Sequence, residues 1–165
     1  MRTAREKPVV MEESECDARK IHDITVFYNT FFPSSLQSEE YKLKLYRNKS
    51  RKPVVLSITA NGKIVGLLES WMSKEDPKIR ILSTILVDPE ARGKGYAKEL
   101  FLQADEQARK DGESSMWVLH FRDSNKESLE AMYTSFGFTD LKQNGAYKNG
   151  EIKWEMTMPI EKQAS

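Results

Sequence analysis

This chain of 165 residues has few cysteines and histidines, and its net charge is close to zero. Each of these features excludes a class of protein. The single cysteine, Cys16, rules out an intramolecular disulfide and a zinc site built from several cysteines. The 26 basic and 25 acidic residues leave a net charge of +1. No overall field therefore attracts nucleic acid, a membrane surface or an acidic partner. With only two histidines and no clustered acids, we expect no metal site.

Long apolar runs are also missing. No stretch approaches the roughly 20 apolar residues of a membrane span, and residues 1–7 lack the apolar core of a secretory signal. We therefore expect a cytoplasmic protein. The length and the absence of repeats predict a single domain over residues 1–165, with its core at about 9–158.

The first third of the chain predicts a strand followed by two helices. The short apolar run 8–11 predicts the strand. Asp17 and Ser38 are suited to cap the N-termini of the two helices. The second helix is expected to present Tyr41 and Leu45 as its apolar side.

Three strand-like runs follow and predict an antiparallel meander. The runs 54–60 and 63–73 are separated by Asn61-Gly62. This dipeptide is a strong hairpin signal, because a type I′ turn needs positive φ at both central residues. The third run, 79–87, ends at Asp88-Pro89, since proline cannot donate a ladder hydrogen bond.

The remaining signals complete an α/β protein. A helix should end at Asp111-Gly112, and a strand at 116–121 should then pair in parallel with the strand at 79–87. Next come a helix at 125–136 and a terminal pair of strands. The residues that we assign to this pair are 138–141 and 151–158, joined by a polar loop at 142–150. The order β-α-α-β-β-β-α-β-α-β-β predicts a mixed, mostly antiparallel twisted sheet flanked by helices.

The loop between the strand at 79–87 and the next helix predicts an anion site. The first N–H groups of a helix lack partners, and the helix dipole favours negative charge there. Gly93 and Gly95 permit close approach of the backbone, and Arg92 and Lys94 add positive charge. We expect a pyrophosphate at this site. Gly93-x-Gly95-x-x-Lys98 lacks the third glycine of a dinucleotide-binding fingerprint, which argues against a Rossmann fold.

Two motifs together resemble a known family. Val87-Asp88-Pro89 followed by Arg92-x-x-Gly95-x-Ala97 resembles the acyl-CoA pyrophosphate loop of the GNAT superfamily of N-acyltransferases. Asn125 followed by Tyr133-x-x-x-Gly137-Phe138 resembles a later helix motif of the same family, and the order of elements is similar to its fold. The resemblance implies an acetyl-CoA-dependent N-acetyltransferase that moves an acetyl group to a primary amine by direct attack on the thioester.

The resemblance also implies which residues bind acetyl-CoA, the cosubstrate. The backbone of Ile85, Leu86 and Val87 would pair with the pantetheine arm. The pyrophosphate would lie on Arg92, Gly93, Lys94, Gly95, Tyr96 and Ala97. Asn125 would contact CoA, although it lies eight residues before Tyr133 where the family commonly has seven. The extra residue implies either a bulge at the helix start or a capping role for Asn125.

Aminolysis of a thioester needs a neutral amine and a proton for the departing thiolate. An alkyl ammonium has an ordinary pKa near ~10.4, so a base must remove its proton at neutral pH. By its place relative to Gly137-Phe138, the resemblance assigns the general acid to Tyr133. The alternative is a core aromatic, since Tyr133 shares an apolar face with Leu129 and Phe136.

Two residues compete for the role of general base. His120 resembles in placement a glutamate that serves as base in family members that acylate protein N-termini, and its ordinary pKa near ~6.5 suits neutral pH. A hydrogen-bonded core histidine is the alternative. Glu69 lies in an otherwise apolar strand, where burial would raise the pKa of its carboxyl. A solvated charge on the outer face of the sheet is the alternative there.

The sequence leaves the acceptor open between a small-molecule amine and a peptide or protein amine. It also leaves open whether the protein forms a homodimer. A different class of function fits the same motifs: a catalytically silent module that binds or senses acyl-CoA without turnover.

Overall fold

The computed structural model describes residues 9–10 and 17–161. Cys16 and the ends of the predicted first strand, Pro8 and Met11, lie outside the described residues. The chain divides into two compact units: residues up to 71 with 84–104, and residues 72–83 with the chain from 105 onward.

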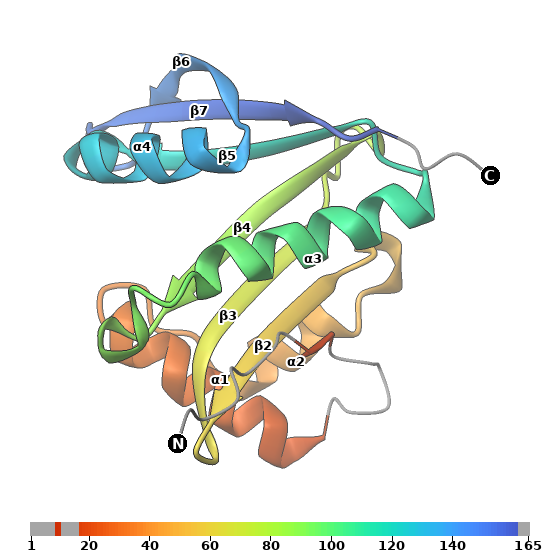
Figure 1. Cartoon of the computed structure of the whole chain (residues 1–165), viewed down its shortest axis with the longest axis vertical. Coiled ribbons are helices and arrows are strands. Elements are labelled where there is room, and N and C mark those ends of the chain that lie inside the picture. The colour runs from red at the N-terminus through yellow and green to blue at the C-terminus, as the bar shows by residue number, and fades with distance from the viewer. Residues whose placement is uncertain (1–8, 11–16, 162–165) are drawn as a thin grey trace. The chain divides into compact units, whose positions relative to one another are not determined.

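The observed elements follow the predicted order (Figure 1). The strands are β1 (Val9–Val10), β2 (Val54–Ala60), β3 (Lys63–Met72), β4 (Ile79–Val87), β5 (Met116–Arg122), β6 (Thr139–Ala146) and β7 (Ile152–Pro159). The α-helices are α1 (Ala18–Phe31), α2 (Glu39–Tyr46), α3 (Tyr96–Asp111) and α4 (Lys126–Phe136). Hydrogen bonding gives the strand order β1-β2-β3-β4-β5-β7-β6, so the predicted mixed α/β fold is confirmed. No helix in the described part of the chain is long and apolar enough to cross a membrane.

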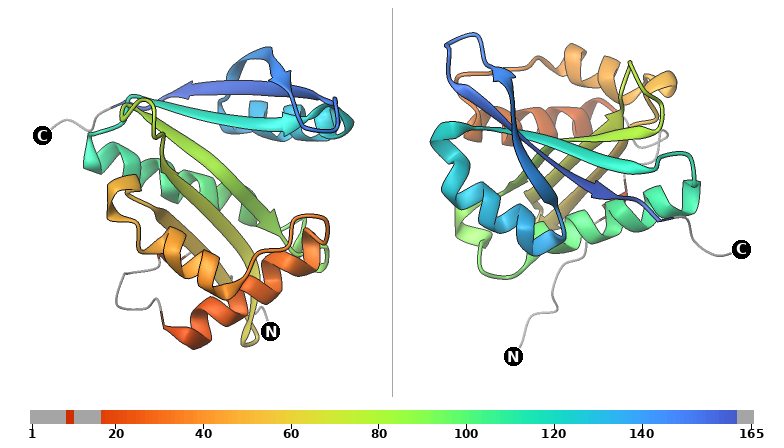
Figure 2. Two further views of the ribbon diagram at one scale, coloured as in Figure 1. Left: turned by 180° about the vertical axis from the view of Figure 1, so that it is seen from behind. Right: turned by 90° about the horizontal axis from the view of Figure 1, so that it is seen from above.

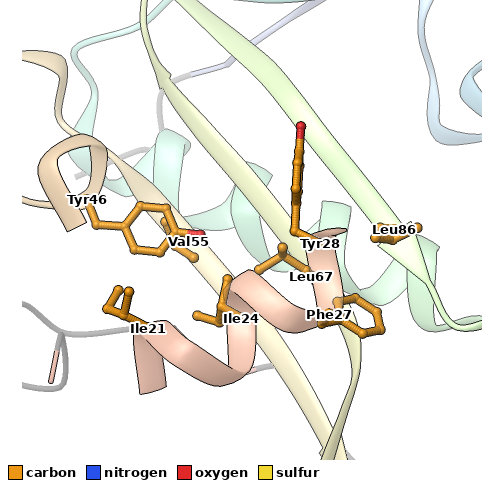
Figure 3. Packing of buried hydrophobic residues seen from close by; sticks show 8 residues of the cluster. All are labelled: Ile21, Ile24, Phe27, Tyr28, Tyr46, Val55, Leu67 and Leu86. Atoms are coloured by element: carbon orange, nitrogen blue, oxygen red, sulfur yellow. The ribbon is translucent and has the colours of Figure 1, made fainter. Parts of the chain in front are cut away.

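In the first unit, helices cover both faces of the strands. Helices α1 and α2 lie against one face of β2 and β3, and the start of α3 lies against the other (Figures 1 and 2). The side chains of α1 enter a buried apolar cluster with residues from α2, β2, β3 and β4 (Figure 3). The labelled members of this cluster are Ile21, Ile24, Phe27, Tyr28, Tyr46, Val55, Leu67 and Leu86.

The predicted helix caps are confirmed, but one helix face is not. The Asp17 carboxylate accepts a hydrogen bond from the Lys20 amide at 2.8 Å, and the Ser38 hydroxyl accepts one from the Tyr41 amide at 3.1 Å. The predicted apolar side of α2 is wrong for Tyr41, which is 48% exposed, but Leu45 is partly buried and packs against the apolar cluster. The fully buried residues of α2 are Lys42 and Tyr46. Lys42 is buried because it has a charged partner on β3.

The hairpin between β2 and β3 forms as predicted. Asn61 and Gly62 have φ values of 54° and 77°, so both adopt the left-handed conformation that a type I′ turn requires. Ala60 faces Lys63 across the turn, and the register shifts by one residue between Thr59 and Ile58 before it continues to Val54 opposite Ser70. The turn and this irregularity together fix which residues of β3 face α1 and α2.

The second unit is built on β5. The first residues of β4, 79–81, pair in parallel with 116–118, which confirms the predicted parallel pair. On its other side, β5 pairs antiparallel with β7, and His120 lies directly opposite Glu155. Helix α4 packs on β5, and the ring centroids of Tyr133 and Phe121 are 6.0 Å apart.

Two boundaries differ from the prediction in this unit. Residues 142–146 are not loop but the second half of β6, because they pair with β7 despite their polar side chains. The predicted helix at 125–136 begins at Lys126, and residues 123–125 form a 3₁₀ turn before it. Gly137 ends α4 in the left-handed conformation, with φ 112°, as the sequence predicts.

Candidate active site

A tight turn joins β4 to α3 in the first unit. The Asp88 carboxylate accepts a hydrogen bond from the Glu90 amide at 2.9 Å and caps a 3₁₀ turn at Pro89–Ala91. Gly93 and Gly95 then adopt φ values of 82° and 76°, which a residue with a Cβ reaches only at a cost. A Cβ at Gly93 would meet no atom within 4 Å, so its backbone conformation, and not crowding within the chain, requires glycine there.

The backbone of this turn presents donors for an anion. Among the described residues, the N–H groups of Gly93, Lys94 and Gly95 have no hydrogen-bond acceptor. Arg92 and Lys94 are exposed beside them, and the Arg92 Nε donates to the Val87 carbonyl at 3.3 Å. Successive free amides at the start of a helix can bind a phosphate group. The predicted anion site therefore has the local geometry that it needs.

The other residues assigned to acetyl-CoA lie in different surroundings. Leu86 and Val87 are buried at the end of β4, and Ile85 is half-buried. Tyr96 is buried at the start of α3. Asn125 is exposed, and its side chain makes no capping hydrogen bond to α4. The extra residue before Tyr133 is accommodated by the 3₁₀ turn, and Asn125 occupies the N-cap position of α4 without a side-chain capping bond.

Tyr133 combines a buried ring with an accessible hydroxyl. Its ring lies about 6 Å from the rings of Phe121, Phe136 and Phe138, which fix its position. Within the described residues the hydroxyl has no hydrogen-bond partner, and its oxygen is not among the sealed polar atoms. Burial raises the pKa of Tyr133 to about 12, so the phenol keeps its proton at neutral pH. The buried ring confirms the alternative of a core aromatic, and the role of the hydroxyl as general acid stays a prediction.

Glu69 is enclosed with a lysine and two tyrosines in the first unit. Its Oε2 accepts hydrogen bonds from the Lys42 Nζ at 2.6 Å and from the Tyr46 hydroxyl at 2.5 Å. The exposed fractions of the Lys42 and Glu69 side chains are 0% and 1%, so the alternative of a solvated surface charge is wrong. The Lys42 Nζ also lies 3.7 Å from the ring centroid of Tyr28. Burial lowers the pKa of Lys42, and the Glu69 carboxylate opposes that shift.

His120 lies in a more open polar cluster in the second unit. Its Nε2 is 3.1 Å from the Glu155 Oε1, and its side chain is 29% exposed. Burial lowers the pKa of His120, although the hydrogen bond to Glu155 opposes the shift. The imidazole is therefore neutral at neutral pH and can accept a proton. The expectation of a hydrogen-bonded histidine is confirmed, and it is compatible with a role as base.

The structure brings His120 together with residues that the sequence did not single out. Neighbouring residues of a strand face opposite sides, so His120 points away from the layer in which Phe121 contacts Tyr133. Sequence reasoning did not single out Glu155, or Lys42 in the first unit. Glu155 occupies one of the polar positions in the alternating pattern of β7, so the pattern does not mark it, and only the register with β5 places it beside His120. In the described residues no group of three or more side chains is arranged to hold a metal ion.

These features define a class of protein, an α/β protein whose fourth strand leads to a helix through a glycine-containing turn with free amides. A sequence model of the acetyltransferase (GNAT) family matches residues 21–138. The chain therefore belongs to the GNAT acetyltransferase family. No curated protein sequence matches it.

Solved structures share the fold at low sequence identity. An aminoglycoside 6′-N-acetyltransferase complexed with coenzyme A is 11% identical, with a TM-score of 0.77 over 95% of this chain and 99% of that one. A Salmonella typhimurium protein solved with its cofactor acetyl-CoA is 16% identical, with a TM-score of 0.72 over 98% of each chain. The ribosomal-protein-S18-alanine N-acetyltransferase from Escherichia coli is 19% identical, with a TM-score of 0.67 over 98% of this chain and 97% of that one.

Proposed function

We propose that this protein is an acetyl-CoA-dependent N-acetyltransferase that acetylates a primary amine by direct attack on the thioester. The observation that carries the proposal is the anion-binding turn at residues 92–97 in a chain of the GNAT family. Structural neighbours solved with acetyl-CoA or CoA support acetyl-CoA as the cosubstrate. The family match includes residues of both units, which supports our proposal of a single N-acetyltransferase domain.

The family resemblance assigns binding to the turn and proton transfer to side chains of β5 and α4. The amides of Gly93, Lys94 and Gly95 would hold the pyrophosphate, with Arg92 and Lys94 adding charge. Acetyl-CoA brings an acyl group on a thiolate leaving group. As the new C–N bond forms and the C–S bond breaks, Tyr133 would give a proton to the thiolate. His120, which faces the other side of β5 from the Tyr133 ring, would take the proton from the amine directly or through one water.

The ionisation of the two side chains suits these roles. The pKa of His120 is lowered by burial, so the free base is present at neutral pH. The pKa of Tyr133 is raised by burial to about 12, so the phenol has a proton to give. Glu69 is a poorer base because its carboxylate already accepts hydrogen bonds from Lys42 and Tyr46.

The neighbours do not select one acceptor for this chain. One acts on an aminoglycoside and another on a ribosomal-protein alanine, as their names state. We propose an amine acceptor, from a small molecule or a peptide.

The test is release of free thiol from acetyl-CoA in the presence of a broad panel of amines and peptides. We expect at least one acceptor to stimulate release above the rate with acetyl-CoA alone, with the acetylated amine identified by mass spectrometry. Binding of CoA measured by calorimetry without acceptor is the parallel measurement. Tight CoA binding with no stimulated release would instead support the silent binding module and overturn the enzyme proposal.

A further inference from the structure

The imidazole of His120 is bound at one nitrogen by a carboxylate that no motif predicts. We propose that Glu155 is a positioning residue. Its carboxylate keeps the ring proton of His120 on Nε2, so that Nδ1 is the nitrogen that accepts a proton. The inference rests on the proposed function, because it specifies how the proposed base is held.

The cluster around Glu155 uses both of its carboxylate oxygens. Oε1 lies 3.1 Å from the His120 Nε2 and accepts a hydrogen bond from the Asn144 Nδ2 at 2.8 Å. Oε2 lies 3.1 Å from the Lys142 Nζ. The Glu155 side chain is only 11% exposed, while that of Lys142 is 64% exposed. One buried anion is thus shared by three donors, and one of the donors is the imidazole.

The charge of Glu155 determines which nitrogen of His120 carries the proton. Burial by itself would raise the pKa of Glu155, but hydrogen bonds from Lys142, Asn144 and His120 together lower it. An ionised carboxylate has no proton to donate, so the short contact requires an N–H on the His120 Nε2. The Asn144 Nδ2 is also 3.4 Å from this nitrogen, but its shorter contact is with the carboxylate.

The other ring nitrogen remains available. The His120 Nδ1 has no hydrogen-bond partner among the described residues, and it is not among the buried unpaired atoms. In a neutral imidazole with its proton on Nε2, Nδ1 carries the lone pair. A carboxylate that fixes one nitrogen and leaves the other accessible is the arrangement by which a histidine base is oriented in unrelated enzymes.

Charged groups from all three strands face the imidazole. Glu155 on β7 raises the pKa of His120, whereas Lys153 on the same strand lowers it. Lys142 and Asn144 on β6 contact Glu155, and Arg122 follows two residues after His120 on β5. Removal of Glu155 would take away the one described carboxylate that raises the pKa of His120 and would leave Lys153, which lowers it. We therefore expect the pKa of His120 to fall further when Glu155 is replaced.

The test uses ¹⁵N-labelled histidine, because the chain has only two histidines. His22→Gln assigns the two sets of ring signals. In the wild type we expect a neutral His120 with its proton on Nε2, seen as a hydrogen-bonded N–H that exchanges slowly. In Glu155→Leu we expect this N–H to exchange rapidly and the pKa of His120 to decrease. Glu155→Gln keeps the side-chain shape, so it provides the same measurement of pKa if the leucine variant folds poorly.

Two matched variants separate the effect of losing Glu155 from the effect of removing another charged residue of the same hairpin. Glu151→Gln removes another carboxylate of the same hairpin, one that contacts Arg122 and the Ser124 amide, and should leave the His120 signals unchanged. Lys142→Met removes the donor on the other oxygen and should preserve the protected Nε2–H. A protected N–H and an unchanged pKa in both Glu155 variants would overturn the proposal.

Kinetics give a second readout. In the Glu155 variants we expect kcat/KM to fall roughly tenfold, with its acidic limb moved to lower pH and the KM for acetyl-CoA unchanged. A loss that appears only in that KM would contradict a role in positioning the base. The ring signals are recorded without acetyl-CoA or acceptor, so they test the His120–Glu155 pair even if no acceptor is found. Failure of the proposed function would appear instead in the thiol-release assay.

Discussion

Each unit of this protein places a carboxylate on a strand beside a basic side chain, with opposite consequences. In the first unit, Glu69 and Lys42 are 1% and 0% exposed, and Tyr46 and Tyr28 also contact them. In the second unit, Glu155 is buried, but the side chain of His120 is 29% exposed. The comparison shows that a charged residue in an apolar strand is a candidate for proton transfer only when its partner keeps an accessible atom.

Burial of the Lys42–Glu69 pair in the first unit costs desolvation free energy, and contacts with neighbouring groups offset that cost. Removing two charges from water costs several kcal/mol per ion in proteins, and good geometry must offset it. The Lys42 ammonium meets the Glu69 carboxylate on one side and the face of the Tyr28 ring on another. These contacts connect α1, α2 and β3. We interpret this cluster as a device that holds α1 and α2 against the sheet.

The largest expected effect is on stability, from breaking the enclosed pair. Lys42→Met leaves the Glu69 charge buried without its cation, which typically costs about 3–5 kcal/mol. The free energy of unfolding in urea measures the loss. Lys42→Met with Glu69→Leu should recover most of it, since an apolar pair of similar volume is often neutral. As the matched control, Lys142→Met should cost less than about 1 kcal/mol, because that lysine is exposed. Equal losses at Lys42 and Lys142 would contradict the distinction between the two regions.

The next effect is kinetic and comes from the open pair. His120→Gln should lower kcat/KM by roughly 10²–10³-fold and remove the acidic limb of its pH profile, because no base remains. The free energy of unfolding should change by about 1 kcal/mol or less. His22→Gln is the control, since His22 is 60% exposed and pairs with the exposed Glu39. If the acidic limb survives in His120→Gln and is lost in Glu69→Gln, the base is in the first unit.

Tyr133→Phe tests the other proton-transfer group of the second unit. We expect kcat to fall by about 10²-fold, because the thiolate loses its proton donor. CoA affinity and the melting temperature should be unchanged, because the ring contacts with Phe121, Phe136 and Phe138 remain. Tyr147→Phe, on the same unit but with a partly exposed ring, is the comparison variant. An unchanged kcat in Tyr133→Phe would remove this residue as the acid.

The smallest effect is the pH dependence of stability due to His120. Burial lowers its pKa in the folded protein below the ordinary value of about 6.5, so the unfolded chain binds more protons in the interval between the two values. Stability should therefore rise with pH through that interval, just below pH 6.5, and lose this contribution at lower pH. Each unit of pKa difference corresponds to about 1.4 kcal/mol. Urea unfolding of wild type and His120→Gln between pH 5 and 8 measures the difference. Parallel curves for the two proteins would contradict the lowered pKa.

Much of the fold was predictable because its signals are local. Asp17 and Ser38 cap helices through amides three residues away, and Asn61-Gly62 turns a hairpin by its own backbone conformation. Gly137 ends α4 for the same reason. The turn containing Gly93 and Gly95 belongs to this group, since its free amides result from the start of a helix. Each of these features needs only the residues beside it.

The failures have a common physical cause, which is a partner distant in the sequence. The pattern places Tyr41 on the apolar side of α2, but Tyr41 is exposed and pairing with Glu69 buries Lys42 instead. The residues 142–146 appeared to be loop because they are polar, but β7 offers them backbone hydrogen bonds. The hydrophobic pattern of a sequence predicts which side chains leave water. It does not predict which residue, distant in the sequence, will pair with a polar group.

The sequence by itself determined the family, the order of the elements and the glycine-containing turn before α3, because these depend on motifs and on neighbouring residues. Only the tertiary structure gave the two candidate bases different surroundings. His120 and Glu69 are both ionisable residues of apolar strands, and nothing in their immediate sequence separates them. The register of β5 with β7 places Glu155 on one ring nitrogen of His120, whereas the packing of α2 on β3 encloses Glu69 with Lys42. Which proton can move is decided by distant contacts, because burial and hydrogen bonding set both the charge of a group and its access to a substrate.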